Sequence, residues 1–104
     1  MKILDELGMN PANKGYTYWK EAINFKNGNY FDIKIIDIYE KIAKKYNTTS
    51  IKVEKDMRYS RQKIKNINEK MEVNFDIDNR TFLALLIKKI GEKNVEKTLF
   101  NNRL

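Results

Sequence analysis

The sequence predicts an all-α fold, a compact bundle of about six helices that contains a helix-turn-helix. Only one proline and four glycines interrupt the 104 residues, so turn signals are few and helices are favoured. Apolar residues recur mostly at three- and four-residue steps, the period of an amphipathic helix. The length suits a single hydrophobic core. We expect one domain over residues 1–91 and a weakly helical or frayed tail over residues 92–104.

The first two helices are predicted from short apolar stripes. Ile3, Leu4 and Leu7 form a stripe that stops at Gly8, which indicates a helix near residues 2–8. Pro11 and Gly15 mark the loop that follows. The stretch "GYTYWKEAINF" then repeats aromatic and aliphatic residues at helical spacing up to "KNGN". We expect these aromatic residues to pack in the core.

A longer helix is expected from near Tyr30 to Tyr46, either continuous or in two pieces, because Phe31, Ile33 and Ile36 supply a second apolar set. The set predicted to point inward is Ile35, Ile38, Ile42 and Tyr46.

The next turn has clear local signals. Asn47 can end the preceding helix, because its short polar side chain tolerates the left-handed backbone conformation. Thr48 or Thr49 can then cap the following helix by accepting a hydrogen bond from a free amide. Ala43, Asn47 and Val53 stand at the spacing of a helix-turn-helix: a small residue, a turn residue and an aliphatic residue that locks the two helices together.

That following helix is predicted over about residues 49–68 with two different faces. The face expected to pack on the core carries Val53, Met57, Ser60, Ile64, Ile67 and Met71, at alternating four- and three-residue steps. The opposite face carries Ile51, Lys55, Arg58, Tyr59, Gln62, Lys65 and Asn66, with Lys52 and Glu54 on its flanks. Such side chains reach base edges and phosphates. A solvated face held by pairs such as Glu54–Arg58 is the alternative.

The last third of the domain contains an arm and a final helix. Val73, Phe75 and Ile77 alternate with polar residues, which predicts a short extended arm. Asn79 is expected to cap the final helix and Gly91 to stop it. The residues predicted to be buried in that helix are Phe82, Leu83, Leu86, Ile87 and Ile90.

Composition limits the classes of function. Lysine and arginine number 21 against 14 acidic residues, a formal charge of +7, so polyanions are the expected partners, nucleic acid first. Cysteine and histidine are absent, which argues against most hydrolytic and metal-dependent enzymes. We therefore expect that the protein is not an enzyme and that it binds no cofactor. Neither a signal peptide nor an apolar run of roughly 20 residues is visible. The chain is therefore interpreted as cytoplasmic.

Three stretches resemble a known family in order and spacing: "ELGMN…KGYTYWKEAI", "IYEKIAKKYNTTSIKVEKDMRYS" and "NRTFLALLIKKI". They are similar to the DNA-binding effector domain of the sporulation response regulator, the stage-zero sporulation protein A family, over roughly residues 3–90. The resemblance implies a recognition helix that reads a short operator box in the major groove of double-stranded DNA. It also implies head-to-tail pairs on tandem boxes, and RNA polymerase contacts through the stretch from Glu69 to Asp78.

The resemblance also implies which residues contact DNA. A family arginine falls on Lys52, the family glutamate on Glu54, a second arginine on Lys55, and a third is kept as Arg58. Tyr59 stands in place of a histidine. Lysine keeps the charge but loses the planar fork that reads guanine, so we expect non-specific affinity to survive and the preferred sequence to drift.

The predicted interface extends beyond those five positions. Two further departures from the family are Asp56, in place of a small apolar residue, and Ile51, which meets a thymine methyl or has no role. Gln62 is expected to support base reading. The hydroxyls and helix-start amides expected to contact phosphates belong to Thr48, Thr49 and Ser50. Additional positive charge toward the DNA backbone is expected from Arg61, Lys63 and Lys65.

Several alternatives stay open. The chain is either an excised effector domain or a standalone paralogue without the family's receiver domain. It could also be a paralogue that pairs with the full-length regulator without reading operator DNA. Membrane binding through the basic helix is a less favoured alternative, because the apolar face of that helix packs on the core and cannot insert into a membrane. Carboxylate pairs such as Asp76/Asp78 and Asp5/Glu6 are explained by capping and solubility.

Overall fold

The computed structural model describes residues 1–28 and 34–102, with side chains described for residues 1–26 and 34–92. No β-strand occurs in the described part of the chain, so the prediction of an all-α fold is confirmed. The helices are α1 (Lys2–Leu7), α2 (Lys14–Gly28), α3 (Ile35–Lys45), α4 (Ser50–Gln62), α5 (Ile67–Met71) and α6 (Asn79–Asn102).

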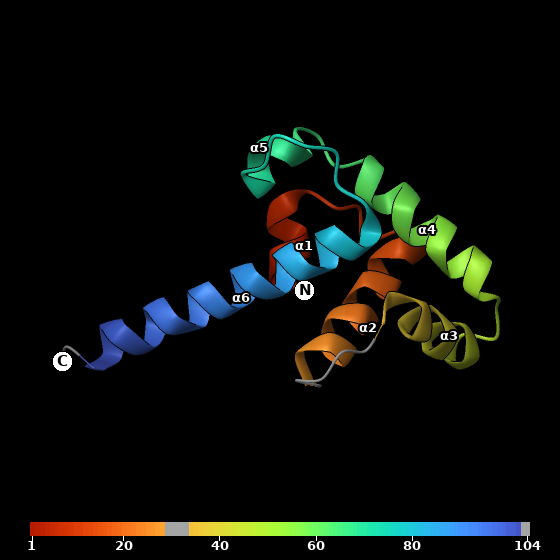
Figure 1. Ribbon diagram of the computed structural model, residues 1–104, viewed down its shortest axis with the longest axis horizontal. Coiled ribbons are helices and arrows are strands. Elements are labelled where there is room, and N and C mark those ends of the chain that lie inside the picture. Colours follow the sequence, from red (N-terminus) through yellow and green to blue (C-terminus); the bar gives the residue numbers. More distant parts are fainter. Residues whose placement is uncertain (29–33, 103–104) are drawn as a thin grey trace.

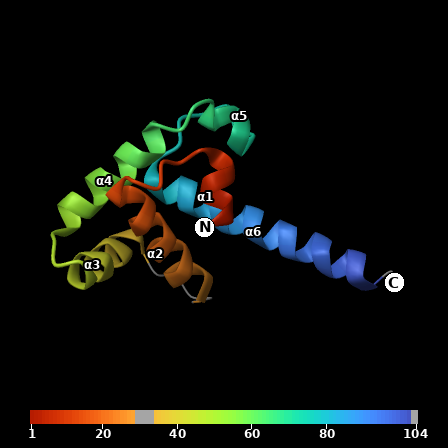
Figure 2. The same ribbon diagram turned by 180° about the vertical axis from the view of Figure 1, so that it is seen from behind.

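The six helices are not equally embedded. Helix α2 runs through the middle of the molecule, while α3 and α4 lie together at one end (Figures 1 and 2). Helix α6 starts beside α2 and α4, and its second half extends away from the body on the side opposite α3. In both views α4 lies along an outer edge of the molecule, so one of its long faces is open.

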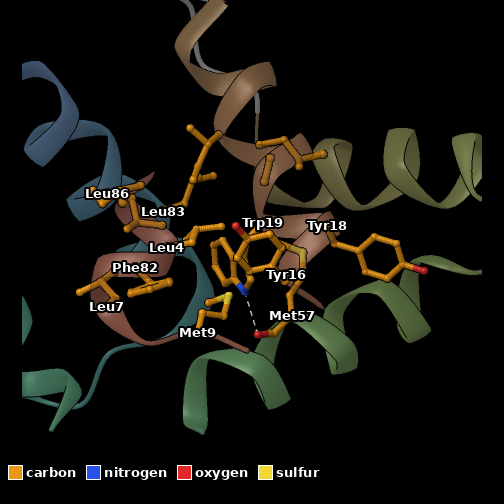
Figure 3. Packing of buried hydrophobic residues seen from close by; sticks show 14 of the residues in the cluster. Leu4, Leu7, Met9, Tyr16, Tyr18, Trp19, Met57, Phe82, Leu83 and Leu86 are labelled. Atoms are coloured by element: carbon orange, nitrogen blue, oxygen red, sulfur yellow. Dashed lines mark hydrogen bonds between the residues drawn. The ribbon is translucent and has the colours of Figure 1, made fainter. Parts of the chain in front are cut away.

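Trp19 of α2 is the centre of the core. Its side chain is fully buried, its Nε1 donates a hydrogen bond of 2.9 Å to the carbonyl oxygen of Met57 in α4, and its ring meets that of Phe82 in α6 edge to face with centroids 4.9 Å apart (Figure 3). Leu4 of α1 and Leu86 of α6 are also fully buried in the cluster. One side chain therefore joins three helices from distant parts of the sequence.

The predictions of the first two helices are confirmed, except that Gly15, expected to mark the loop, lies in the first turn of α2. Helix α1 ends at Gly8, whose left-handed backbone (φ 84°) is the conformation that glycine adopts without strain. The carbonyl oxygen of Leu7 accepts a hydrogen bond of 3.0 Å from the ammonium of Lys70, which closes the open end of α1. Tyr16 in the first turn of α2 donates a 2.6 Å hydrogen bond from its hydroxyl to Asp5, so α1 and α2 are also joined on their polar side.

Helix α3 begins at Ile35, while the predicted start near Tyr30 and the second apolar set at Phe31 and Ile33 lie outside the described residues. Ile38 and Ile42 are fully buried, as expected. The expectation that Tyr46 points inward is wrong, because it is the residue that ends α3 and 38% of its surface is exposed. Ile36 is also exposed.

The helix predicted over residues 49–68 is shorter than expected. Helix α4 ends at Gln62, and Asn66 has a left-handed backbone (φ 55°) that a right-handed helix cannot continue. The short helix α5 then begins at Ile67. Ile64 and Met71 are still buried, but from the turn and from α5. The apolar residues keep an even helical spacing through this stretch, so their pattern did not reveal that the chain changes direction at Asn66.

Residues 73–78, predicted as a short extended arm, connect α5 to α6 as a loop without a strand. The helix that follows differs from the prediction in two ways. The cap of α6 is Asp78, whose carboxylate accepts a 2.7 Å hydrogen bond from the Thr81 amide, while Asn79 is buried and bonded elsewhere. Gly91 does not end the helix, because α6 continues to Asn102. Glycine ends a helix only when its backbone turns left-handed.

Replacing the cap of α6 should make the protein less stable in a pH-dependent way. The hydrogen bond from the Thr81 amide holds the pKa of Asp78 below its usual range. A lowered carboxyl pKa contributes stability that is present above the unfolded-state pKa and is lost as the pH falls through the folded-state pKa. Asp78→Ala should cost about 1 kcal/mol at neutral pH and less in acid, in urea titrations followed by circular dichroism. Asp76→Ala, an exposed acid in the same loop, is the control and should change little.

Candidate nucleic-acid interface

Helices α3 and α4 form the predicted helix-turn-helix. Asn47 has the expected left-handed backbone (φ 53°), and the Thr48 amide donates a 2.9 Å hydrogen bond to the carbonyl oxygen of Ala43. Val53 is fully buried beside this turn. Thr49 caps α4, because its hydroxyl oxygen accepts a 3.2 Å hydrogen bond from the amide of Lys52. The local predictions about this turn are therefore confirmed.

The same turn is clamped by contacts that were not predicted from the sequence. Lys45 at the end of α3 donates to both carboxylate oxygens of Glu21 in α2, at 2.9 and 3.0 Å, and the Tyr46 hydroxyl donates to the same carboxylate at 3.2 Å. The ring of Tyr46 meets that of Tyr18 with centroids 5.4 Å apart. The bond to Glu21 raises the pKa of Lys45. Tyr18 and Glu21 are three residues apart and so lie on one face of α2. This spacing is the sequence signal from which a shared contact with another helix could have been predicted.

The outer face of α4 carries most of the predicted contact residues. The side chains that are exposed there are Ile51, Lys52, Lys55, Arg58, Tyr59 and Gln62, while Ser50 and Glu54 are half-buried. Ile51 is the most exposed apolar residue of the set, at 70%. On the other face, Val53, Met57 and Ser60 are buried. The helix thus has one side for the core and one cationic side for solvent.

A shallow hollow lies along this outer face near the end of α4. It encloses about 330 Å³ and is lined by Lys55, Asp56, Arg58, Tyr59 and Gln62. The ammonium of Lys63 lies 5.1 Å from the centre of the Tyr59 ring, a cation–π contact that keeps positive charge beside the aromatic surface. One carboxylate oxygen of Asp56 is buried and finds no hydrogen-bond partner among the described residues.

The prediction that Arg61 adds charge to this surface is wrong. Arg61 is only 8% exposed, and its Nε donates a 2.9 Å hydrogen bond to Asn79 at the start of α6. Its Nη1 donates to the carbonyl oxygen of Ile77. Burial lowers the pKa of the guanidinium. Arg61 follows Met57 by four residues, so it lies at the edge of the buried stripe, and this spacing was the signal that it points inward.

The remaining predicted phosphate contacts are distributed around α4. Thr48 is half-buried and Thr49 is exposed at the start of the helix, the end of a helix that favours an anion. Lys65 is exposed in the turn after α4 and does not belong to the helix, contrary to the prediction. The charge of Lys65 is therefore not part of the charged side chains on the outer face of α4.

Within the described residues, two other kinds of site are absent. Neither of the two longest helices nor any other has the length and apolar character needed to cross a membrane. No group of three or more acidic, cysteine or histidine side chains is arranged to hold a metal ion within residues 1–26 and 34–92.

The comparison with known families gives one finding. Residues 1–90 match the model of a family described as "Sporulation initiation factor Spo0A C terminal". The matched range includes α1 to α5 and the first half of α6. It contains the helix-turn-helix and the whole cationic face of α4.

Proposed function

Since the chain belongs to the Spo0A C-terminal family, we propose that it is a sequence-specific transcription regulator whose helix α4 enters the major groove of double-stranded DNA. The observation that supports this most directly is the two-sided character of α4. Its inner face is held in the core behind a helix-turn-helix, while Lys52, Lys55 and Arg58 are exposed in one row on the outer face. A rigid helix with such a row is suited to a polyanionic groove.

The side chains of α4 divide by chemistry into two roles. Arg58 has the planar fork that matches the N7 and O6 atoms of guanine. Lys52 and Lys55 are point charges that approach base edges or phosphates with less discrimination. Tyr59, the next residue in the chain, and Gln62, one turn further along, support Arg58, and Ile51 reaches a thymine methyl.

Phosphate contacts hold the helix in register at both ends. Thr48, Thr49 and Ser50 supply hydroxyls where α4 begins, and the start of a helix favours a phosphate. Lys63 and Lys65 supply charge where it has ended. Because these groups contact the backbone of the duplex, they contribute affinity without sequence preference.

Removal of one charge from each class should give different results. Arg58→Ala should weaken binding to the preferred duplex by about 1–3 kcal/mol and blunt the preference at one base pair. Lys65→Ala should weaken binding to all duplexes alike and reduce the dependence of log K on log salt by roughly one. Fluorescence anisotropy on selected and random duplexes at several salt concentrations measures both.

The contrast between these two variants tests the proposal. If Arg58→Ala and Lys65→Ala have identical effects on selected and random duplexes, the division into base and phosphate contacts is wrong. If the wild-type protein selects no sequence from a random duplex pool at low salt, sequence-specific binding is excluded.

Two further partners follow from the family resemblance as part of this proposal. The first is RNA polymerase, contacted through the stretch from Glu69 to Asp78; in it, Phe75 is 50% exposed and is surrounded in sequence by acidic residues. The second is another copy of the chain, bound head to tail on tandem boxes. Phe75→Ala should leave DNA affinity unchanged and reduce transcription from a selected site, which separates the polymerase contact from DNA binding.

A second candidate function is that of an interaction module that modulates the full-length regulator. The lysines at positions 52 and 55, where the family has arginines, favour it because they weaken guanine readout. Co-purification with the regulator, together with no gel shift at low salt, would support this alternative. A gel shift on selected duplexes in the absence of the regulator would exclude it as the sole function.

A further inference from the structure

A second hollow, of about 600 Å³, lies between the end of α2 and the starts of α3 and α6. We call it the α3–α6 hollow. Its volume falls within the range of about 300–1,000 Å³ that is typical of sites for small organic ligands. None of the described residues that line it belongs to α4 or to the turn before α4. The α3–α6 hollow is therefore separate from the face of α4 that we propose to contact DNA.

The floor of the α3–α6 hollow is aliphatic. Ile35 and Ile36 of α3 form it together with Leu83 and Ala84 of α6. Leu83 belongs to the core and is only 3% exposed, whereas 57% of the surface of Ile36 is exposed although its side chain is large and apolar. Covering such a side chain with another apolar group removes its surface from water, which is favourable. The floor thus offers a place for an alkyl chain.

Three cations from separate parts of the chain surround this floor. Lys26 lies near the end of α2, Lys34 precedes α3, and Arg80 is in the first turn of α6. Within the part of the chain that has described side chains, none of the three forms an ion pair. The charge of Asp78 acts on Arg80, but its carboxylate already accepts the hydrogen bond from the Thr81 amide. Lys34 also caps α3 without a side-chain hydrogen bond, at the end of a helix that favours an anion.

We propose that the α3–α6 hollow binds an aliphatic carboxylate, with the alkyl chain on the floor and the carboxylate among the three cations. The described lining consists of cations and aliphatic side chains, without the hydroxyl or amide side chains that would orient a sugar or a nucleobase. An alkyl chain with one anionic end matches both kinds of lining. Arg80 adds a planar fork that suits a carboxylate. This inference does not depend on the proposed function.

The first test uses the full chain without DNA. Isothermal titration calorimetry measures the binding of butanoate, hexanoate, octanoate and decanoate, each kept below the concentration at which it forms micelles. Every added CH₂ should lower Kd by up to about 4-fold until the hollow is filled, because burial of one CH₂ contributes about 0.8 kcal/mol. Octylammonium has the same chain as octanoate and the opposite charge. It should not bind over the same concentration range, because the three cations repel it.

The second test assigns the binding to the lining residues. Arg80→Gln and Lys34→Gln should each weaken octanoate binding by roughly 2- to 5-fold, the range expected for an ion pair that is open to solvent. Ile36→Ser should reduce the gain in affinity per added CH₂. These three side chains are exposed, so the urea midpoints of unfolding should stay close to that of the wild-type protein. Lys44→Gln, which removes an exposed lysine of α3 outside the hollow, is the control and should leave octanoate binding unchanged.

Several results would overturn the inference. Equal affinity for butanoate and decanoate would mean that charge alone attracts the ligand, and equal binding of octylammonium would mean that charge plays no part. Equal losses in Lys44→Gln and Arg80→Gln would place the effect in the overall charge of the protein. Binding to vesicles of anionic lipid, without binding to free octanoate, would indicate a membrane contact. Displacement of octanoate by a random DNA duplex would assign the three cations to the nucleic-acid interface. Failure of the wild-type protein to select a DNA sequence would overturn the proposed function and leave the octanoate result unaffected.

Discussion

Trp19→Ala should reduce the free energy of unfolding by about 3–5 kcal/mol, the largest effect expected for one side chain of this protein. The ring is fully buried between α2, α4 and α6, and it holds both the hydrogen bond to Met57 and the edge-to-face contact with Phe82. A domain of this size has a total stability of about 5–15 kcal/mol. The variant should therefore unfold at much lower urea concentration, or be partly unfolded without urea.

The measurement and its control follow from the composition. Trp19 is the only tryptophan, so unfolding of the variant must be followed by circular dichroism, while the wild-type protein can also be followed by fluorescence. Trp19→Phe keeps an aromatic ring and removes the N–H, and should cost about 1–2 kcal/mol. Equal losses for the two variants would mean that the hydrogen bond, and not packing, dominates at this position.

Gly15→Ala should destabilise the protein by about 1–3 kcal/mol, although alanine is ordinarily the better helix former. A methyl group at this position of α2 would lie 2.0 Å from the Ser60 hydroxyl and 2.2 Å from the carbonyl oxygen of Asp56. The second atom belongs to the backbone of α4, so the two helices must move apart. Because α4 carries the cationic face, the same variant should also weaken DNA binding. Urea titration and anisotropy measure the two effects.

The same substitution at Gly91 is a matched control with the opposite sign. Gly91 lies within α6, and an added methyl group would meet no atom within 4 Å. Gly91→Ala should stabilise the protein by about 0.5–1 kcal/mol through helix propensity alone. Ser60→Gly should rescue only part of the loss in Gly15→Ala, since the backbone contact remains. Full rescue by Ser60→Gly would show that the contact with the backbone of α4 does not cause the loss of stability.

Features that depend on a few neighbouring residues could be predicted from the sequence. Asn47 and Thr49 define the helix-turn-helix because a left-handed turn and a side-chain cap are local events. The end of α1 at Gly8 was predicted for the same reason. The exposed row on α4 followed from the helical period, which places residues four apart on one face.

Features that depend on distant partners could not be predicted. Arg61 lies at the edge of the apolar stripe of α4, but its burial depends on Asn79 and Ile77, which follow it by 18 and 16 residues and accept hydrogen bonds from its guanidinium. The clamp of the turn joins Glu21 to Lys45 across 24 residues. Gly91 was expected to end α6, and whether a glycine turns left-handed there is not determined by its identity alone.

By itself, the sequence determined the helical class, the positions of the helix-turn-helix and the cationic side of α4, because each follows from short-range periodicity, capping and charge. The tertiary structure alone decided where α4 stops, which partners bury Arg61, and how Asn79 anchors the backbone of α4 at the carbonyl oxygen of Glu54. The reason is physical: a buried polar group is stable only when a partner reaches it, and here those partners come from segments that the chain brings together only on folding.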